Sequence, residues 1–193
     1  MRRVLILGTI LLASSASSAA SGPAVGTAAP EFSGRNIMTG DKIDLAAERG
    51  KLVIVTFFAT WCGPCKRELP ILERAQQLVG KERLRVFAVD FRDASDAARQ
   101  LRGAVKTWQT TFVEDRTGVI ARKYNISGIP HLFMIDRDGQ IIANHLGYGD
   151  RSVEDLVNDI NHALRGSAPV PAETPSPAAV STPEGPAAAT SNL

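Results

Sequence analysis

The chain has 193 residues, of which 44% are hydrophobic and 22% are charged. This length suits one domain with extensions, and this composition is typical of a globular protein with a hydrophobic core. Arg2 and Arg3 account for the formal net charge of +2, since 20 basic and 20 acidic residues remain without them. Because no basic patch with interleaved aromatic residues is visible, the composition argues against a nucleic-acid partner.

Residues 1–20 have the pattern of a secretory signal peptide. Arg2 and Arg3 precede an apolar run at 4–13, and small residues follow, with predicted cleavage after Ala19 or Ala20. The alternative is an uncleaved anchor on the outer face of the inner membrane, although a membrane span needs about 20 apolar residues. We therefore predict an exported, periplasmic protein in a compartment that allows disulfides, with membrane anchoring only if the leader stays uncleaved.

Residues 21–165 are predicted to form one domain. Two short strands, at 36–38 and 42–45, are expected around a turn at 39–41. The run at 51–58 is rich in β-branched and aromatic residues and predicts a buried strand. The helix predicted after this strand has apolar residues at helical spacing, namely Leu69, Leu72, Ala75 and Val79.

The second half of the domain continues the alternation of strands and helices. The predicted strands are 84–89, 110–113, 131–135 and 140–145, and the predicted helices are 94–108, 118–124 and 153–164. Asp93 is the predicted cap of the helix at 94–108, and Asp150 or Ser152 that of the last helix. These elements predict an α/β fold in which helices cover both faces of a mixed central sheet, with a short N-terminal hairpin.

Residues 166–193 differ in composition from the domain. They are rich in Pro, Ala, Ser and Thr, they contain no aromatic residue, and Glu173 and Glu184 are their only charges. Such a segment buries too little apolar area to offset the entropy lost on ordering, so we predict a disordered tail. A spacer or low-affinity tether and a tail without a partner are both compatible with this composition.

The only two cysteines of the chain, Cys62 and Cys65, lie between the strand at 51–58 and the helix that follows. The free N–H groups and the partial positive charge of a helix N-terminus stabilise a thiolate, which is the reactive form of cysteine. We predict a dithiol that cycles with a disulfide, in which a partly exposed Cys62 is the nucleophile and a more buried Cys65 resolves the mixed disulfide.

Two other roles for the cysteines are less well supported. A static disulfide would close so small a loop that it would constrain little entropy of the unfolded chain. A zinc site would need more ligands, and the three histidines show no ligand spacing, so neither a metal nor another cofactor is predicted. The three histidines are His131, His145 and His162.

The motif Trp61-Cys62-Gly63-Pro64-Cys65 after an apolar strand, Pro70 in the next helix, and Gly128-Ile129-Pro130 before a strand resemble the thioredoxin superfamily. Together with the leader and the Ala29-Pro30-Glu31-Phe32 segment, they make residues 28–165 similar to the TlpA/ResA-like extracytoplasmic thiol–disulfide oxidoreductases. The resemblance implies a thioredoxin-like fold with this activity. Its implied partners are oxidised protein substrates, such as apocytochrome c, and a membrane-embedded thiol electron donor.

The resemblance also implies roles for residues near the cysteines. Ile129-Pro130 would be a cis peptide bond, and the Ile129 backbone would pair with the substrate. Glu68 would accept or deliver a proton during exchange, the alternative being an exposed helix charge. Trp61 would cover the sulfurs and offer an apolar docking surface, the alternative being core packing. Gly63 and Pro64 offer no imidazole to stabilise the thiolate, which favours a reductant with a potential near the −270 mV of thioredoxin, an approximate value.

Two positions depart from the pattern of these relatives. Thr56 replaces a buried aspartate of cytoplasmic thioredoxins, so Glu68 is the expected substitute as proton acceptor. His131 replaces a threonine, and its imidazole would hydrogen-bond a substrate or tune Cys62, unless it serves a surface or packing role. The alternatives to a reductase are an oxidase or isomerase of the same fold and a non-catalytic binding or chaperone module. A peroxidase is disfavoured because Cys62 has its resolving cysteine within the same motif, and the chain has no third cysteine.

Overall fold

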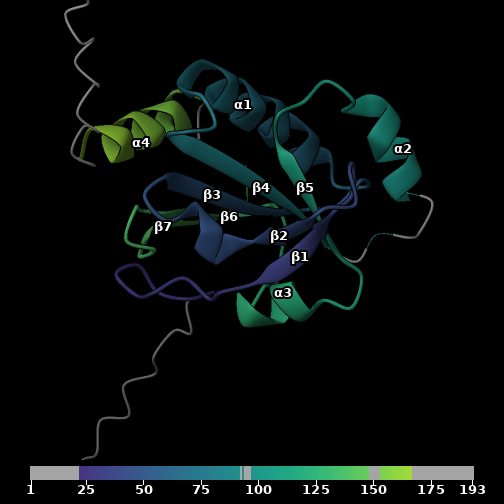
Figure 1. The fold of residues 1–193 in the computed structure, drawn as a ribbon, viewed down its shortest axis with the longest axis horizontal. Coiled ribbons are helices and arrows are strands. Elements are labelled where there is room, and N and C mark those ends of the chain that lie inside the picture. Colours follow the sequence, from purple (N-terminus) through teal and green to yellow (C-terminus); the bar gives the residue numbers. More distant parts are fainter. Residues whose placement is uncertain (1–21, 92, 94–96, 148–152, 167–193) are drawn as a thin grey trace, which may run out of the picture.

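Seven β-strands form one mixed sheet in the computed structural model, which describes residues 22–91, 93, 97–147 and 153–166 (Figure 1). The strands are β1 (Ser33–Asn36), β2 (Lys42–Asp44), β3 (Leu52–Phe58), β4 (Leu84–Phe91), β5 (Thr111–Asp115), β6 (His131–Ile135) and β7 (Ile141–Leu146). The helices are η1 (Leu45–Glu48), α1 (Gly63–Val79), α2 (Ala97–Ala104), α3 (Val119–Lys123) and α4 (Val153–Gly166).

The sheet has the order β2-β1-β5-β4-β3-β6-β7. β4 pairs in parallel with both β3 and β5, whereas β6 and β7 add antiparallel strands on the far side of β3. The β1–β2 hairpin joins the opposite edge, antiparallel to β5. The predicted mixed sheet with an N-terminal hairpin is confirmed, and the architecture is thioredoxin-like.

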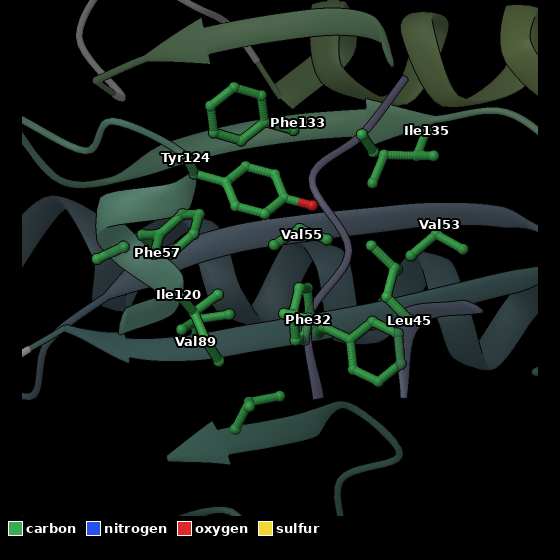
Figure 2. Packing of buried hydrophobic residues seen from close by; sticks show 14 of the residues in the cluster. Phe32, Leu45, Val53, Val55, Phe57, Val89, Ile120, Tyr124, Phe133 and Ile135 are labelled. Atoms are coloured by element: carbon green, nitrogen blue, oxygen red, sulfur yellow. The ribbon is translucent and has the colours of Figure 1, made fainter. Parts of the chain in front are cut away.

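Both faces of β3 are buried, which explains its continuous run of apolar residues. Val53, Val55 and Phe57 point to one face, where Phe32 and Tyr124 complete the first cluster of the core (Figure 2). The residues between them point to the other face, where they pack against α1 and α4. Helices therefore cover both faces, as predicted, with α3 on one side and α1 and α4 on the other (Figure 1).

The N-terminal hairpin lies earlier in the chain than the sequence suggested. The predicted strand at 36–38 is wrong, because β1 ends at Asn36. The Asn36 side-chain oxygen accepts the backbone N–H of Met38 at 2.8 Å, and Asn36 also accepts the N–H of Gly40 through its carbonyl at 2.8 Å. These local bonds begin the turn at residue 37, and the pairing of Arg35 with Glu114 and of Asn36 with Val113 moves the strand toward the N-terminus.

The predicted helix at 94–108 is longer than α2. After Ala104 the chain continues in a turn, in which the Trp108 N–H donates to the Val105 carbonyl at 3.0 Å. The predicted signal peptide, the cap residues Asp150 and Ser152, and the tail from residue 167 lie outside the described residues, as do residues 94–96 beside the predicted cap Asp93. Gly166, placed in the tail by its composition, is instead the last residue of α4.

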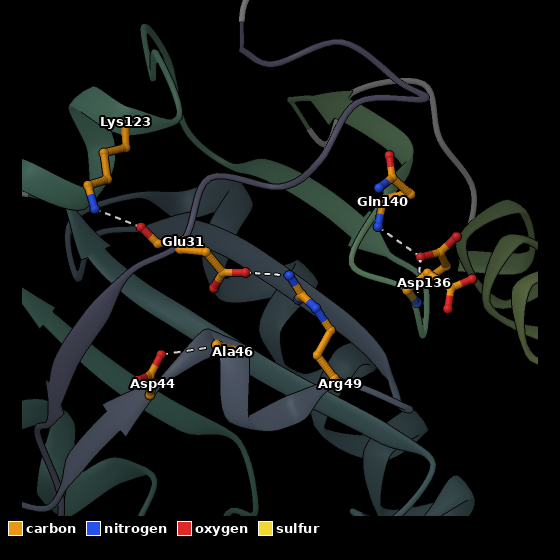
Figure 3. Close-up of polar contacts among 8 residues, drawn as sticks. Glu31, Asp44, Ala46, Arg49, Lys123, Asp136 and Gln140 are labelled. Carbon is orange, nitrogen blue, oxygen red and sulfur yellow. Dashed lines mark hydrogen bonds and ion pairs between the residues drawn. The ribbon is translucent and has the colours of Figure 1, made fainter.

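Polar contacts hold the segment before β1 against the rest of the domain (Figure 3). The Glu31 carboxylate forms an ion pair with Arg49, and the Glu31 carbonyl accepts a hydrogen bond from the Lys123 ammonium at 2.7 Å. Further along, the Ala29 N–H donates to the Gly139 carbonyl at 2.9 Å. Gly139 has a φ of +82°, a conformation that L side chains rarely adopt, and a Cβ there would lie 2.3 Å from Arg49 Cζ and displace this guanidinium.

A buried carboxylate joins α1 to the start of β5. Glu73 is buried, and its oxygens accept the backbone N–H groups of Gln109 and Thr110 and the Thr110 hydroxyl, each at 2.8 Å. Burial acts to raise the pKa of Glu73, but these hydrogen bonds and one from Gln77 outweigh it and hold the pKa below its usual value. The carboxylate therefore remains charged and fully used as an acceptor.

His131 begins β6 and is fully buried. Its ring stacks on Phe133 with the centroids 4.5 Å apart, and its Nε2 lies 2.7 Å from Asn144 Oδ1. Burial lowers the pKa of His131, although the hydrogen bond with Asn144 acts in the opposite direction. A direct contact between His131 and a substrate is incompatible with this burial, which fits the packing role, whereas an influence of His131 on Cys62 stays a prediction.

The Glu73 network predicts a large effect on stability. Glu73→Ala leaves two backbone N–H groups and a hydroxyl without their acceptor, and each such group costs about 1–3 kcal/mol when it stays buried. We expect urea unfolding to show a loss of about 2–5 kcal/mol, the range for a broken buried network. The exposed Glu82 is the matched control, and Glu82→Ala should change the free energy of unfolding by less than about 0.5 kcal/mol. Equal effects of the two variants would contradict the assignment.

The burial of His131 predicts that stability depends on pH. An unfolded chain protonates histidine at a pKa of about 6.5, whereas the folded protein does so only at lower pH. Protonation therefore favours the unfolded state, so this contribution is complete above about pH 6.5 and is lost as the pH falls below it. In urea unfolding between about pH 7.5 and pH 5, we expect the wild type to lose more stability than His131→Phe. The difference should be about 1.4 kcal/mol for each unit by which folding lowers the pKa of His131. Parallel pH curves of the two proteins would show that His131 does not titrate in this way.

Candidate active site

The two cysteines form a disulfide at the N-terminus of α1. Cys62 is the N-cap residue, and its sulfur accepts the backbone N–H of Cys65 at 3.2 Å. The two Cα atoms lie 5.3 Å apart. Strand β3 ends at Phe58, so the sheet delivers the cysteines to the one place on α1 where backbone N–H groups are free to stabilise a thiolate.

Cys62 is more buried than the sequence suggested, whereas Cys65 is buried as expected. Cys62 was predicted to be partly exposed, but in the disulfide state it is 5% exposed, against 1% for Cys65. The two sulfurs belong to a core cluster that includes Phe58, Ala88 and Leu69. The predicted order of accessibility holds, since Cys62 is the more accessible of the two cysteines.

The residues around the cysteines are exposed. Trp61 is 67% exposed, which excludes the alternative that it serves as core packing. Gly63 and Pro64 are also exposed, and Pro64 lies in the first turn of α1, where a missing N–H costs little. An exposed indole directly before Cys62 places apolar surface beside the more accessible sulfur.

Glu68 lies one turn beyond Cys65 in α1, and it points into the protein. It is 4% exposed, so the alternative of an exposed helix charge is wrong. Thr56, on the face of β3 that packs against α1, is buried and donates its hydroxyl to Glu68 Oε1 at 2.7 Å. The structure therefore brings together the threonine that replaces the thioredoxin aspartate and the glutamate expected to substitute for it.

The loop before β6 lies beside the cysteines. The Ile129-Pro130 peptide bond is cis, as the resemblance implied. Ile129 is half-buried and packs against the core cluster that contains Cys62 and Cys65, while Pro130 is buried and its carbonyl accepts the Gly147 N–H at 2.7 Å. Within the described part of the chain, no backbone hydrogen bond is formed by the N–H or the carbonyl of Ile129.

Sequence reasoning missed the role of two aspartates near the site. Asp93, predicted only as a helix cap, accepts the Thr60 N–H through Oδ2 at 2.7 Å. Asp90, predicted only as the end of a strand, is a buried carboxyl beside it. The sequence did contain a signal for Asp90, which is an acidic residue at the end of a buried strand. The carboxyl end of β4 lies beside that of β3, and β3 leads to the cysteines.

No group of three or more metal-binding side chains is found within residues 22–91, 93, 97–147 and 153–166. In the same part of the chain, no helix combines the length and the apolar character that a membrane span requires.

Comparison with known proteins identifies the family. Residues 24–160 match the family model described as Redoxin. The chain is 36% identical over 124 residues to thioredoxin-like protein YneN of Bacillus subtilis (strain 168), covering 63% of this chain and 71% of the relative. It is 32% identical over 120 residues to thiol-disulfide oxidoreductase ResA of Bacillus thuringiensis subsp. konkukian (strain 97-27), covering 61% of this chain and 67% of the relative.

A solved structure supports the same grouping. The crystal structure of a thiol:disulfide interchange protein of the thioredoxin family from Chlorobium tepidum TLS has a TM-score of 0.58 and 29% identity, covering 74% of this chain and 99% of that one. The chain therefore belongs to the Redoxin family, with the thioredoxin-like fold and the paired cysteines of its thiol–disulfide oxidoreductases.

Proposed function

We propose that the protein is an exported reductant of protein disulfides, with Cys62 as nucleophile and Cys65 as resolving cysteine. The observation that carries this proposal is the Cys62–Cys65 disulfide at the start of α1, with the Cys65 N–H directed at the Cys62 sulfur. In the reduced protein, the same N–H favours the thiolate of Cys62 over that of Cys65. This asymmetry gives the two cysteines different tasks.

The reaction is a pair of thiol–disulfide exchanges. The Cys62 thiolate attacks one sulfur of a substrate disulfide, forms a mixed disulfide and releases one substrate thiolate, which takes up a proton. The Cys65 thiol then loses its proton and attacks the Cys62 sulfur, which forms the Cys62–Cys65 disulfide and releases the second substrate thiol. Two electrons pass from the protein to the substrate, and a dithiol donor must return them.

Glu68 is the proposed proton acceptor for Cys65. It is buried one helical turn away, and a buried carboxylate beside a thiol takes up a proton more readily than bulk water does. The Thr56 hydroxyl fixes one of its oxygens. This arrangement would replace the buried aspartate of cytoplasmic thioredoxins by a glutamate that approaches from the helix side.

The substrate is proposed to be an extended polypeptide segment with an accessible disulfide. The N–H and carbonyl of Ile129, which form no backbone hydrogen bond within the described residues, offer backbone pairing in the manner of strand addition, and the exposed Trp61 offers apolar contact next to Cys62. Apocytochrome c, which presents a pair of heme-attachment cysteines, is the proposed substrate class. In an oxidising periplasm, a membrane-embedded thiol donor would keep the protein reduced.

An oxidase or isomerase of the same fold would use the same two cysteines in the opposite direction. The surroundings of Cys62 support the reducing direction, because Gly63 and Pro64 supply no imidazole and the disulfide is buried. A more stable thiolate would make the pair a stronger oxidant.

The assignment of the two cysteines predicts different failures of their serine variants. Cys62→Ser should reduce insulin disulfides no faster than a reaction without protein, because the attacking sulfur is gone. Cys65→Ser should attack but not resolve, so mixed disulfides with substrate proteins should accumulate and be visible on non-reducing gels. Full insulin reduction by Cys62→Ser would contradict the redox function and favour a binding module.

The proposed role of Glu68 predicts a slower resolving step. Glu68→Gln keeps the size and the oxygen that accepts from Thr56 but cannot take up the proton, and we expect the rate to fall by about 10–100-fold. The measurement is the rate at which a preformed mixed disulfide on Cys62 is resolved, followed against pH. Glu82→Gln, which changes an exposed carboxylate, is the control and should leave this rate unchanged. A Glu68→Gln rate equal to that of the wild type would remove Glu68 from the mechanism.

A further inference from the structure

A carboxylate from outside the cysteine motif holds the backbone that leads into it. Asp93 Oδ2 accepts the N–H of Thr60 at 2.7 Å, across 33 residues of sequence. Thr60 lies two residues before Cys62, whose own N–H donates to the Ala59 carbonyl at 3.1 Å. The short loop that carries Trp61 and Cys62 is therefore fastened to Asp93.

A second carboxyl lies beside Asp93. Asp90 lies beside Phe58 in the parallel pairing of β4 with β3, on the same face of the sheet as Ala88, which packs in the cluster that contains both cysteines. It is only 6% exposed. Oδ1 of Asp90 and Oδ1 of Asp93 are both buried, and neither has a hydrogen-bond donor among the residues that the structure describes.

A single proton resolves this arrangement. Ionised carboxylates only accept hydrogen bonds, so two of them side by side leave their buried oxygens unsatisfied, whereas a proton on one makes it a donor to the other. Burial raises the pKa of Asp90, and the charge of Asp93 and the hydrogen bond between the two side chains raise it further, to about 7. The Asp93 backbone N–H acts in the opposite direction, and the charge of Glu114 adds to the rise.

Glu114 is the other charged group that acts on Asp90, and Lys66 is the charged residue beside Thr60. Glu114 pairs with Asp90 across β5 and β4, and it forms an ion pair with Arg116 at 2.7 Å. Lys66 of α1 lines the same groove as Thr60. The two Oδ1 atoms have no hydrogen-bond partner among the described residues, so a proton shared between the two carboxyls would supply the donor that they lack.

We propose that Asp93 is a positioning residue of the redox site, which holds the loop from Thr60 to Cys62 in place and is itself held by a proton shared with Asp90. The inference rests on the proposed redox function of Cys62. Its consequence is geometric: the sulfur of Cys62 keeps its position against the Cys65 N–H, 3.2 Å away, because the loop before it cannot shift. In this proposal Asp93 does not contact either sulfur and acts on Cys62 only through the Thr60 backbone.

Two variants of Asp93 separate position from charge. Asp93→Ala and Asp93→Asn both remove the negative charge, but only the alanine removes the acceptor for Thr60, since an asparagine oxygen accepts the same N–H. The readout is the alkylation rate of Cys62 in the reduced protein as a function of pH, together with the rate of insulin reduction. We expect Asp93→Ala to raise the midpoint of the alkylation profile and to slow insulin reduction by about tenfold, since small displacements of reacting groups cost up to about 100-fold.

Asp93→Asn should reduce insulin at a rate within about threefold of the wild type, a smaller change than the loss of a reacting group's orientation causes. Asp44→Ala is the matched control, because it also removes a carboxylate that accepts a backbone N–H, from Ala46 at 3.1 Å, but in η1. It should change neither readout. Equal profiles of Asp93→Ala and Asp93→Asn, or a wild-type profile for Asp93→Ala, would overturn the positioning role.

If Asp93→Ala does not fold, amide hydrogen exchange of the wild type provides a second test of the proposal. The Thr60 amide should be protected at neutral pH, and in Asp90→Asn it should remain protected, because the asparagine NH₂ replaces the shared proton as donor to Asp93. A Thr60 amide that exchanges in the wild type as fast as an unprotected one would overturn the proposal. A wild type that fails to reduce insulin at all would instead overturn the proposed function, so the two failures are distinguishable.

Discussion

The site depends on one contact, the hydrogen bond from the Cys65 N–H to the Cys62 sulfur at the first turn of α1. A helix N-terminus stabilises negative charge only within its first turn, so the sulfur must be held there closely. The sheet supplies this constraint, because β3 ends four residues before Cys62 and is buried on both faces. The loop between β3 and α1 has little freedom, and the thiolate forms where its charge is best stabilised.

Around this contact, buried carboxyls occupy three positions with separate tasks. Glu73 joins α1 to the start of β5 and stabilises the fold. Glu68 lies on the same helix, one turn beyond Cys65, and is the proposed acceptor of the proton that Cys65 loses. Asp93, with Asp90 beside it, accepts the Thr60 N–H of the loop before Cys62. Burying a carboxylate is costly unless it is hydrogen-bonded, so each of these groups indicates a specific demand at its position.

Much of the fold was predictable because strong local patterns agree with the tertiary structure. The strand at 131–135 and the helix after the cysteines follow directly from residue pattern and spacing. The hairpin at β1 was misplaced because its register depends on pairing with β5, which lies far away in the sequence. In the site, spacing identified Cys62 and Cys65, whereas the burial of Glu68 and His131 and the reach of Asp93 to Thr60 are tertiary properties that no local pattern contains.

The central claim is that Cys62 and Cys65 act as one two-electron couple on the reducing side. The most direct test equilibrates the protein with glutathione or dithiothreitol buffers and counts free thiols by alkylation and mass spectrometry. The account predicts that both thiols appear together, in a single transition close to the thioredoxin value of about −270 mV. A transition near the value of the strong oxidant DsbA, about −120 mV, or cysteines that no buffer converts, would contradict it.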